Sequence, residues 1–364
     1  MSEIENVKSV IRKTGSGGID FPNGLKISGS NFVPGATRYS QAEEPSSPTN
    51  GDTWWDTDDE KYKMYINDSW MVLYGDEDLR YWFGSRGVWA GGSKDDMNYI
   101  TIQTTGNSTS FGNLTSISYT GSGTSDGVRG VIHLGSTDNS SPSVKIDYIT
   151  VATTGNAANF GDMGTGALMY ANSVCDGNIA VIGNGWNGSV NAADLNYITV
   201  QTTGNATDFG DLTAARRIGT AVNDATYGVW AGGFTSSYTN IMDYITIATP
   251  GNGTDFGDLT ASPSFASSAV GDRTRGVFGG GSYMDYITIA TPANATNSGY
   301  NGGSRPSNDR ARGVSDASRG VFGNAYPGYQ DSSMIYITIQ SLSNAATFGT
   351  DSPHQWFYAG LSGT

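Results

Sequence analysis

Residues 242–260 read MDYITIATPGNGTDFGDLT, and near-copies of this stretch occur five more times along the chain. The copies align on a Tyr-Ile-Thr core, and its tyrosines are Tyr99, Tyr148, Tyr197, Tyr244, Tyr286 and Tyr336. Successive tyrosines lie 49, 49, 47, 42 and 50 residues apart, a period typical of repeated blades or arrays. Twelve residues after each tyrosine stands a phenylalanine, which only the fifth copy replaces, by Ser298. A unit of constant length therefore recurs within a period that varies.

Each copy carries the pattern of several strands. Tyr-Ile-Thr-Ile alternates with a period of two, and a turn such as Thr-Pro-Gly-Asn then reverses the chain toward Phe-Gly, which predicts a β-hairpin. A weaker motif of the form Arg-Gly-Val-Trp precedes each hairpin and predicts another strand. These motifs begin at Arg86, Arg129, Ile179, Tyr227, Arg275 and Arg319. A less regular strand fits before that motif, for instance between Ser264 and Asp272, so each repeat predicts four strands.

The composition indicates an all-β chain and limits its partners. The 51 glycines and the lack of helix-forming runs favour short strands joined by tight turns. A formal net charge of −14 would repel polyanions, so we expect no nucleic-acid partner and no membrane insertion. No apolar run reaches membrane-spanning length, and the first residues lack the apolar core of a secretory signal, which predicts a soluble, uncleaved chain. Cys175 is the only cysteine, which excludes an intramolecular disulfide.

From about residue 79 onward, the repeat resembles the Kelch type of β-propeller. The resemblance lies in a four-stranded repeat of this length, with a glycine pair such as Gly91-Gly92 closing one strand and an aromatic-led strand after it. It implies a six-bladed Kelch-like β-propeller over residues 76–364. The chain departs from the Kelch pattern because Phe-Gly stands where a late tryptophan is usual. A β-solenoid is the alternative, but parallel solenoid coils are much shorter than these repeats.

A closed ring of blades needs its ends joined, because the first and last sheets would otherwise leave unpaired edges. The tail SPHQWFYAGLSGT resembles the stretch that opens a blade, so we expect it to supply the inner strand of the first blade, beside Gly87–Gly91. The alternative inner strand is Arg80–Phe83. Six blades follow in either case, although a cryptic seventh stays open.

Residues 1–75 contain no copy of the repeat and form a different unit. Residues 1–50 predict an extended arm and linker, because Gly and Pro interrupt their short apolar pieces. Residues 51–75 predict a small three-stranded β-meander. Its start, Gly-Asp-Thr-Trp-Trp-Asp-Thr, resembles small modules of bacteriophage tail-fibre and other virion proteins. The Tyr-Ile-Thr repeats also resemble structural proteins of phages that infect marine bacteria, including cyanobacteria.

This second resemblance implies a virion structural protein of tail-fibre or surface-fibre type, located on the tail or capsid surface of a phage particle. The N-terminal arm would bind other virion proteins through its apolar side chains. These are Ile19, Phe21, Leu25, Ile27 and Phe32. The propeller would present its loops to a host-surface glycan or protein, and we expect a homo-oligomer on the particle. The alternatives are a purely architectural decoration or adaptor subunit and a glycan-degrading enzyme.

Candidate catalytic groups are few. Only His133 and His354 are histidines, and no nucleophile lies beside a base in the sequence, so His133 and Cys175 are interpreted as buried structural residues. Two sets of aspartates recur at fixed places in the repeat, which indicates turn caps and not one active site. The first set follows Phe-Gly and the second precedes the tyrosine; they are Asp162, Asp211 and Asp258, and Asp147, Asp243 and Asp285. We expect no enzyme activity, no metal and no cofactor.

The loops between the second and third strands of each repeat are the predicted binding face. The distance from the glycine or alanine of the second-strand motif to the tyrosine varies from 10 to 18 residues, whereas the tyrosine-to-phenylalanine hairpin has one length. Variation in a loop costs the core little. These loops carry aromatic residues suited to stacking on sugars or anchoring a protein; they are Trp186, Tyr238, Tyr283, Tyr326 and Tyr329. The alternative is that they pack on neighbouring loops.

Overall fold

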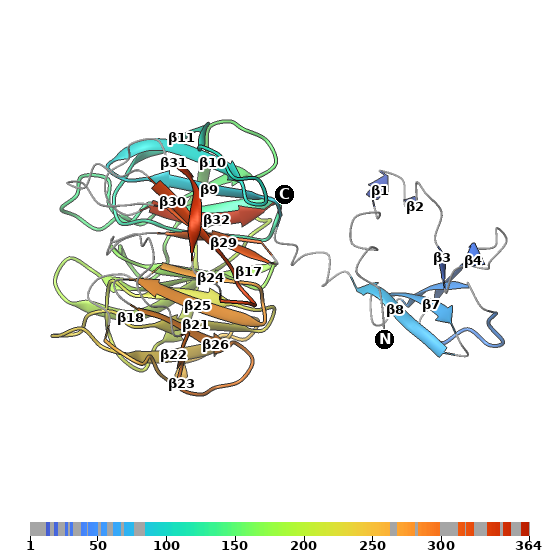
Figure 1. The fold of residues 1–364 in the computed structure, drawn as a ribbon. Coiled ribbons are helices and arrows are strands. Elements are labelled where there is room, and N and C mark those ends of the chain that lie inside the picture. The colour runs from blue at the N-terminus through green and yellow to red at the C-terminus, as the bar shows by residue number, and fades with distance from the viewer. Residues whose placement is uncertain are drawn as a thin grey trace. The chain divides into compact units, whose positions relative to one another are not determined.

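A computed structural model of the chain divides it into two units, Met1–Leu79 and Arg80–Thr364. In the first unit it describes residues 12–14, 18–20, 26–27, 30–31, 38–41, 43–49, 52–56, 61–66 and 69–75. In the second it describes residues 84–262, 268–280, 283–298, 312–316, 318–323, 333–342, 345–350 and 358–363. Within these ranges every regular element is a strand, as the sequence predicts (Figure 1).

The first unit contains one four-stranded sheet and two short strand pairs. The sheet is formed by β5 (Arg38–Gln41), β6 (Thr53–Asp56), β7 (Lys61–Ile66) and β8 (Ser69–Gly75). The pairs are β1 (Arg12–Thr14) with β2 (Gly18–Asp20), and β3 (Lys26–Ile27) with β4 (Ser30–Asn31). The predicted three-stranded meander is present as β6, β7 and β8, which pair antiparallel.

One strand of that sheet comes from the predicted linker. β5 pairs parallel with β6, and the indole Nε1 of Trp54 donates to the carbonyl oxygen of Gln41 at 2.8 Å. The rings of Tyr39 and Trp70 meet edge to face at 6.3 Å. A four-residue strand with no alternating pattern of its own leaves little signal in a sequence, and here the side chains of the meander hold it in place.

Within the described residues, the second unit is a propeller-like arrangement of six antiparallel four-stranded sheets. In strand order these are β32-β9-β10-β11, β12-β13-β14-β15, β16-β17-β18-β19, β20-β21-β22-β23, β24-β25-β26-β27 and β28-β29-β30-β31. The first three sheets use β9 (Arg86–Gly91), β10 (Lys94–Thr101), β11 (Thr109–Ser118), β12 (Ser122–Ser125), β13 (Arg129–His133), β14 (Lys145–Thr150), β15 (Ala158–Asp162), β16 (Asn172–Cys175), β17 (Ile179–Trp186), β18 (Asn191–Thr199) and β19 (Thr207–Asp211), together with the last strand, β32 (Tyr358–Gly363). The other three use β20 (Thr220–Asn223), β21 (Tyr227–Ala231), β22 (Ile241–Thr246), β23 (Thr254–Asp258), β24 (Ser268–Gly271), β25 (Arg275–Gly280), β26 (Tyr283–Thr288), β27 (Thr296–Asn297), β28 (Gly313–Ser315), β29 (Arg319–Phe322), β30 (Ser333–Thr338) and β31 (Ala346–Thr350).

The repeated Phe-Gly glycine lets the next sheet approach closely. A Cβ built on Gly161 would lie 2.1 Å from the carbonyl oxygen of Gly204, which belongs to the turn of the following copy. In the same contact, the amide of Gly204 donates to the carbonyl of Phe160 at 2.9 Å, and the side-chain oxygen of Asn205 accepts from the amide of Asp162 at 3.1 Å. Equivalent bonds recur along the repeat, so both ends of the quoted motif bind neighbouring copies.

The aspartate before the tyrosine also joins neighbouring copies. Asp147 and Asp285 are fully buried, and each accepts from the amide and the hydroxyl of a threonine in the preceding copy. Burial raises the pKa of Asp147, against the hydrogen bonds of Thr115. These aspartates are structural, but the predicted role as turn caps is wrong, because they bond across sheets.

Turn caps are formed by other aspartates, in the hairpin between the first and second strands. Asp126, for example, accepts from the amides of Val128 and Arg129 at 2.9 and 2.7 Å. The equivalent caps are Asp176, Asp224, Asp272 and Asp316. The predicted caps Asp162, Asp211 and Asp258 instead offer their backbone amides to an asparagine of the next copy. Copies with an aspartate before the tyrosine therefore use one aspartate for a hairpin and a different one for a sheet contact.

The core lies between sheets. The residue after each Gly-Val of the second strand packs against the preceding sheet, as Trp230 does on Val181 and Leu195. Trp89, Trp230 and Phe278 are each at most 1% exposed. Because one sheet cannot cover both of its faces, each copy provides apolar surface that only a neighbouring copy covers.

The last strand pairs with the first repeat. β32 lies antiparallel beside β9, with Leu361 opposite Val88, as the sequence predicts (Figure 1). The indole of Trp89 donates to the carbonyl of Arg312 at 3.0 Å, and the guanidinium of Arg319 donates to the carbonyl of Ile102 at 3.1 Å. The sixth and first sheets are thus bonded to each other. The alternative strand, 80–83, lies outside the described residues.

Candidate functional site

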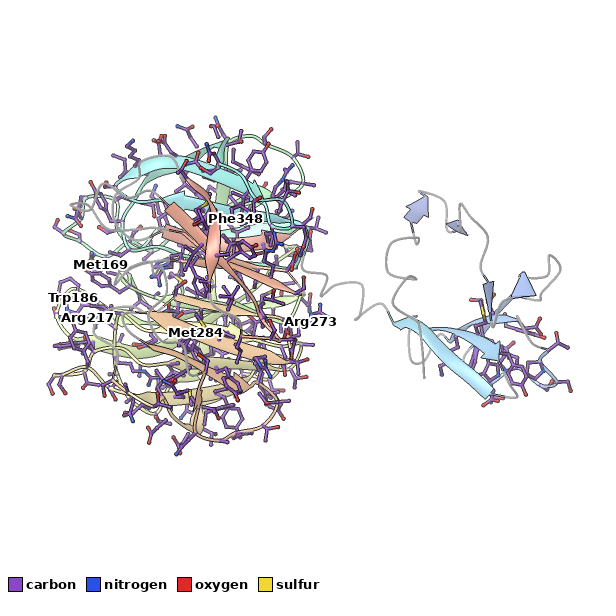
Figure 2. The ribbon with its side chains drawn as sticks, viewed as in Figure 1. Met169, Trp186, Arg217, Arg273, Met284 and Phe348 are labelled. Atoms are coloured by element: carbon purple, nitrogen blue, oxygen red, sulfur yellow. The ribbon has the colours of Figure 1, made fainter. Side chains whose placement is uncertain are left out.

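The connections between second and third strands leave one edge of the second unit, which we call the loop face. The hairpins between first and second strands, and between third and fourth, leave the opposite edge, the hairpin face. Trp186 and Arg217 lie together at the loop face, whereas Arg273 lies at the hairpin face (Figure 2). The loop face is where the sequence predicts binding.

The structure describes part of the predicted binding set. Trp186 ends β17, and Tyr238 lies between β21 and β22; both side chains are half-buried. Tyr283 begins β26, but its side chain lies outside the described residues, as do Tyr326 and Tyr329 entirely. Among the predicted anchoring residues, Ile19 and Ile27 lie on β2 and β3. Phe21, Leu25 and Phe32 lie outside the described residues.

Trp186 and Tyr238 belong to one cluster, although they come from different sheets. The guanidinium carbon of Arg217 lies 6.0 Å from the ring centre of Trp186 and 5.3 Å from that of Phe234. The ring of Phe234 meets Tyr238 edge to face at 5.3 Å. We call these four residues the aromatic–arginine cluster. The cation of Arg217 lies near the rings of both Trp186 and Phe234, a cation–aromatic arrangement that recognition sites use.

A buried ion pair positions the loop that carries Arg217. The neighbouring Arg216 is fully buried and bonds through its guanidinium to the carboxylate of Asp243. It also donates from Nε to the carbonyl of Gly232 at 2.9 Å. Arg217 itself exchanges two backbone hydrogen bonds with Phe234, of 2.7 and 3.2 Å. The loop between β19 and β20 is therefore tied to β21 and β22 beneath the cluster.

The cluster retains hydrogen-bonding capacity. The Nε atom of Arg217 is buried and has no hydrogen-bond partner within the described part of the chain. The amide of Asn191 donates to the carbonyls of Phe234 and Thr235, at 3.0 and 2.8 Å, and so fixes the loop around Phe234. A buried donor without a partner is costly, so it marks a place where a ligand or water would gain a bond.

Sequence reasoning missed Arg217 and Phe234. The signal was present in the sequence. Before β20, Phe-Gly-Asp-Leu-Thr is followed by Ala-Ala-Arg-Arg, a pair of arginines that no other copy has at that point. In a chain with net charge −14, two adjacent cations outside the repeat deserve a specific explanation. The structure gives one for each, because Arg216 is structural and Arg217 faces the cluster.

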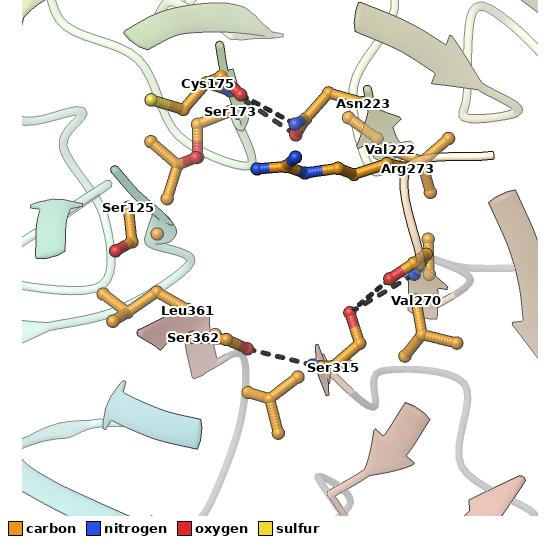
Figure 3. Close-up of a pocket in the computed structure, with 18 of the residues that line it drawn as sticks. Ser125, Ser173, Cys175, Val222, Asn223, Val270, Arg273, Ser315, Leu361 and Ser362 are labelled. Atoms are coloured by element: carbon orange, nitrogen blue, oxygen red, sulfur yellow. Dashed lines mark hydrogen bonds between the residues drawn. The ribbon is translucent and has the colours of Figure 1, made fainter. Parts of the chain in front are cut away.

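A second candidate is a cavity of about 130 Å³ enclosed by the innermost strands (Figure 3). Three of its polar side chains link those strands to each other. Asn223 donates to the carbonyl of Cys175 at 2.7 Å, and the hydroxyl of Ser315 donates to the carbonyl of Gly271 at 2.9 Å. The hydroxyl of Ser362 accepts from the amide of Ser315 at 2.9 Å. These bonds hold neighbouring innermost strands together, so these three wall residues have a structural role.

Arg273 also belongs to that wall. Its side chain extends over the cavity from the hairpin between β24 and β25 (Figure 3). Its φ of 75° is left-handed, and the equivalent positions in two other copies are Gly127 and Gly177, with φ of 93° and 94°. A long side chain at a position that favours glycine stores strain. Arg273 narrows the cavity, and the cavity gives no further sign of a ligand.

The remaining titratable groups of the core are structural. His133 is fully buried, and burial lowers its pKa from 6.5 to about 4 despite a hydrogen bond of 3.0 Å between Nε2 and the carbonyl of Ser143. Burial also raises the pKa of the Cys175 thiol far above its usual range. Both sequence interpretations are confirmed as to burial. Within the described ranges, no cluster of three metal-ligating side chains occurs.

Comparison with known proteins gives no family. No family model matches the chain, and no curated protein shows a significant match to it. No helix in the described ranges has the length and apolar character to cross a membrane.

Proposed function

We propose that this chain is a structural protein of a phage particle, of tail-fibre or surface-fibre type. Its second unit is a six-bladed, closed, Kelch-like β-propeller, and that propeller presents the loop face to a host-surface glycan or protein. Its first unit binds other virion proteins, and several copies assemble on the particle. The virion assignment rests on the sequence resemblances, and the binding face rests on the structure.

Contacts between the first and last sheets support closure. Besides the pairing of β32 with β9, the amide of Gly106 donates to the carbonyl of Phe348 at 2.9 Å, the same contact that Gly155 makes with Phe111 and Gly204 makes with Phe160. Trp89, Ile102 and Met334 share one apolar cluster. A ring without free edges provides a rigid support for loops, which suits a protein that displays a binding surface outside the cell.

The aromatic–arginine cluster is the observation that carries the binding proposal. The recurring residues form contacts between sheets, so their role is to stabilise the fold. Trp186, Arg217 and Tyr238 do not recur, and they meet at the loop face. Aromatic and arginine side chains are enriched where proteins bind partners. Non-repeating residues that converge at one place indicate selection for a function other than folding.

The test uses the full chain, a double variant and a control. Fluorescently labelled protein is incubated with a panel of marine bacteria that includes cyanobacteria, and with the particle's other structural proteins. Trp186→Ala with Tyr238→Ala should abolish cell binding. Val128→Ala, an exposed apolar side chain (57% exposed) in a hairpin-face turn, should leave it intact. Binding of the double variant at the original level would refute the face assignment, and binding only to virion proteins would indicate an architectural subunit.

A further inference from the structure

A separate pocket of about 310 Å³ lies at the loop face, between the second and third sheets. It is lined by the segment Thr165–Leu168, which connects β15 to β16, by Asn187 and Ser189 at the tip between β17 and β18, and by Asp194 on β18. Its volume is at the low end of ligand pockets, about 300–1,000 Å³, and suits a ligand the size of a sugar ring. The aromatic–arginine cluster does not contribute to its wall.

The pocket is built where the second copy departs from the repeat, after the phenylalanine of its hairpin. The usual Phe-Gly-Asp-Leu-Thr becomes Phe-Gly-Asp-Met-Gly-Thr, followed by Gly-Ala-Leu. Thr165 still makes the contact expected between copies, donating from its amide to Asn196 at 2.9 Å. The motif is one residue longer here than Phe-Gly-Asp-Leu-Thr. Next to Thr165, a Cβ on Gly166 would meet no atom within 4 Å. The scaffold contact is kept while open space is added.

Asp194 is the distinctive side chain of the pocket. It lies three residues before Tyr197, where the other copies carry Asp96, Lys145, Ile241, Tyr283 and Ser333, so the repeat does not require a carboxylate there. The Asp194 side chain is half-buried, and its carboxylate makes no hydrogen bond or ion pair within the described residues. Asp96, at the same position in the first copy, lies 3.7 Å from the ammonium of Lys94.

The tip between β17 and β18, on the other side of the pocket, provides hydrogen-bond donors. The side-chain oxygen of Asn187 accepts from the amides of Ser189 and Val190, both at 3.0 Å, which leaves its NH₂ group free to donate into the pocket. The hydroxyl of Ser189 adds a group that donates and accepts. Buried Leu168 supplies an apolar part of the wall. An acceptor, donors and an apolar surface thus line one small space.

We propose that this pocket binds a neutral sugar ring, such as a hexose unit of a surface glycan. Vicinal hydroxyls would donate to the Asp194 carboxylate and accept from Asn187, and a C–H face of the ring would pack on Leu168. An ammonium group cannot use the donors of the tip, and an anion is repelled by Asp194 and by the net charge of −14. The inference rests on the proposed function, because it names the ligand class of the same face.

The test measures ligand-observed NMR binding of glucose, galactose, mannose and N-acetylglucosamine to the full chain, with glucuronate and N-acetyl-lysine as charged probes. At least one neutral sugar should bind more tightly than both charged probes. Asp194→Asn should weaken that binding by roughly tenfold or more, because a carboxylate is a stronger acceptor than an amide. Asp96→Asn is the matched control and should bind as the original chain does.

The outcomes separate this pocket from the proposed function. Absence of neutral-sugar binding, equal binding by Asp194→Asn, or binding of N-acetyl-lysine alone would overturn the pocket. If cell attachment still depends on Trp186 and Tyr238 in that case, the proposed function stands without the pocket. If Asp194-dependent sugar binding occurs but no bacterium is bound, the pocket stands and the attachment role fails.

Discussion

The two faces of the propeller-like unit differ in how much of their sequence repeats. At the hairpin face, every described inner hairpin carries a capping aspartate, and the turns between third and fourth strands repeat Thr-Thr-Gly-Asn or a close variant. At the loop face, connections vary in length and composition, and Arg217 and Phe234 each occur once in the pattern. The repeating face joins copies to one another. The variable face is free to differ between copies, so specific binding can be localised there.

Removing the tail should produce the largest effect, because it breaks the pairing on which both faces depend. Deleting residues 352–364 removes β32, exposes the edge of β9 and leaves Val88 without Leu361. We expect a loss of at least about 4 kcal/mol in the free energy of unfolding, or roughly 10 °C in melting temperature for a unit of this size. Calorimetry on the original and truncated chains measures it. An unchanged melting temperature would contradict closure.

Two glycines that face each other across one hairpin-face contact should behave oppositely. Gly161→Ala would place a methyl group 2.1 Å from the carbonyl oxygen of Gly204, whereas a Cβ on Gly204 meets no atom within 4 Å. Overpacking against backbone costs typically 1–3 kcal/mol, so we expect a loss of about 3 kcal/mol for Gly161→Ala and less than about 0.5 kcal/mol for Gly204→Ala. Denaturant unfolding of both variants tests this, and equal losses would contradict the close approach.

Much of the scaffold could be predicted because each strand is written several times. A weak signal such as the inner strand Ser268–Gly271 becomes readable when five other segments stand at the same place in the repeat. The tail was identified in the same way, from its likeness to a blade opening. The aspartates show the limit of this reasoning: recurrence indicates a structural role, but the partner of Asp147 lies in another copy, and spacing alone does not name it.

The proposed binding face was only partly predictable. Variable loop length indicated it, and aromatic content selected Trp186 and Tyr238, which the structure brings into one cluster. Arg217 and Asp194 were missed, because one charged residue in a polar loop gives no sign of what it will meet across 20 or more residues of sequence. What could have been used was the variation at these positions, since no other copy has an arginine where Arg217 stands and only the first copy shares the aspartate of Asp194.

A buried histidine ties one loop of the loop face to the core and should make stability depend on pH. The folded pKa of His133 is about 4 and its usual value is 6.5, so between these values the unfolded state takes up the proton first. His133 should therefore lower stability as pH falls from about 6.5 to about 4, by roughly 3 kcal/mol in total. His133→Gln keeps a donor for Ser143 without titrating. Chemical unfolding of both chains across this range should show a smaller pH dependence for the variant; parallel profiles would contradict a neutral buried imidazole.

Two adjacent arginines give the sharpest comparison of scaffold with site, because one substitution should change stability little and the other strongly. Arg217→Met keeps the apolar stem of the side chain and removes the guanidinium between Trp186 and Phe234, so we expect stability to change by less than about 1 kcal/mol. Cell binding should nevertheless fall, because the cation of the cluster is lost. Arg216→Met leaves the Asp243 carboxylate buried without its partner, which costs roughly 3–5 kcal/mol. Unfolding and cell-binding measurements on both variants separate the two roles: similar losses of stability would mean that Arg217 also belongs to the scaffold, and undiminished binding by Arg217→Met would remove the cation from the recognition site.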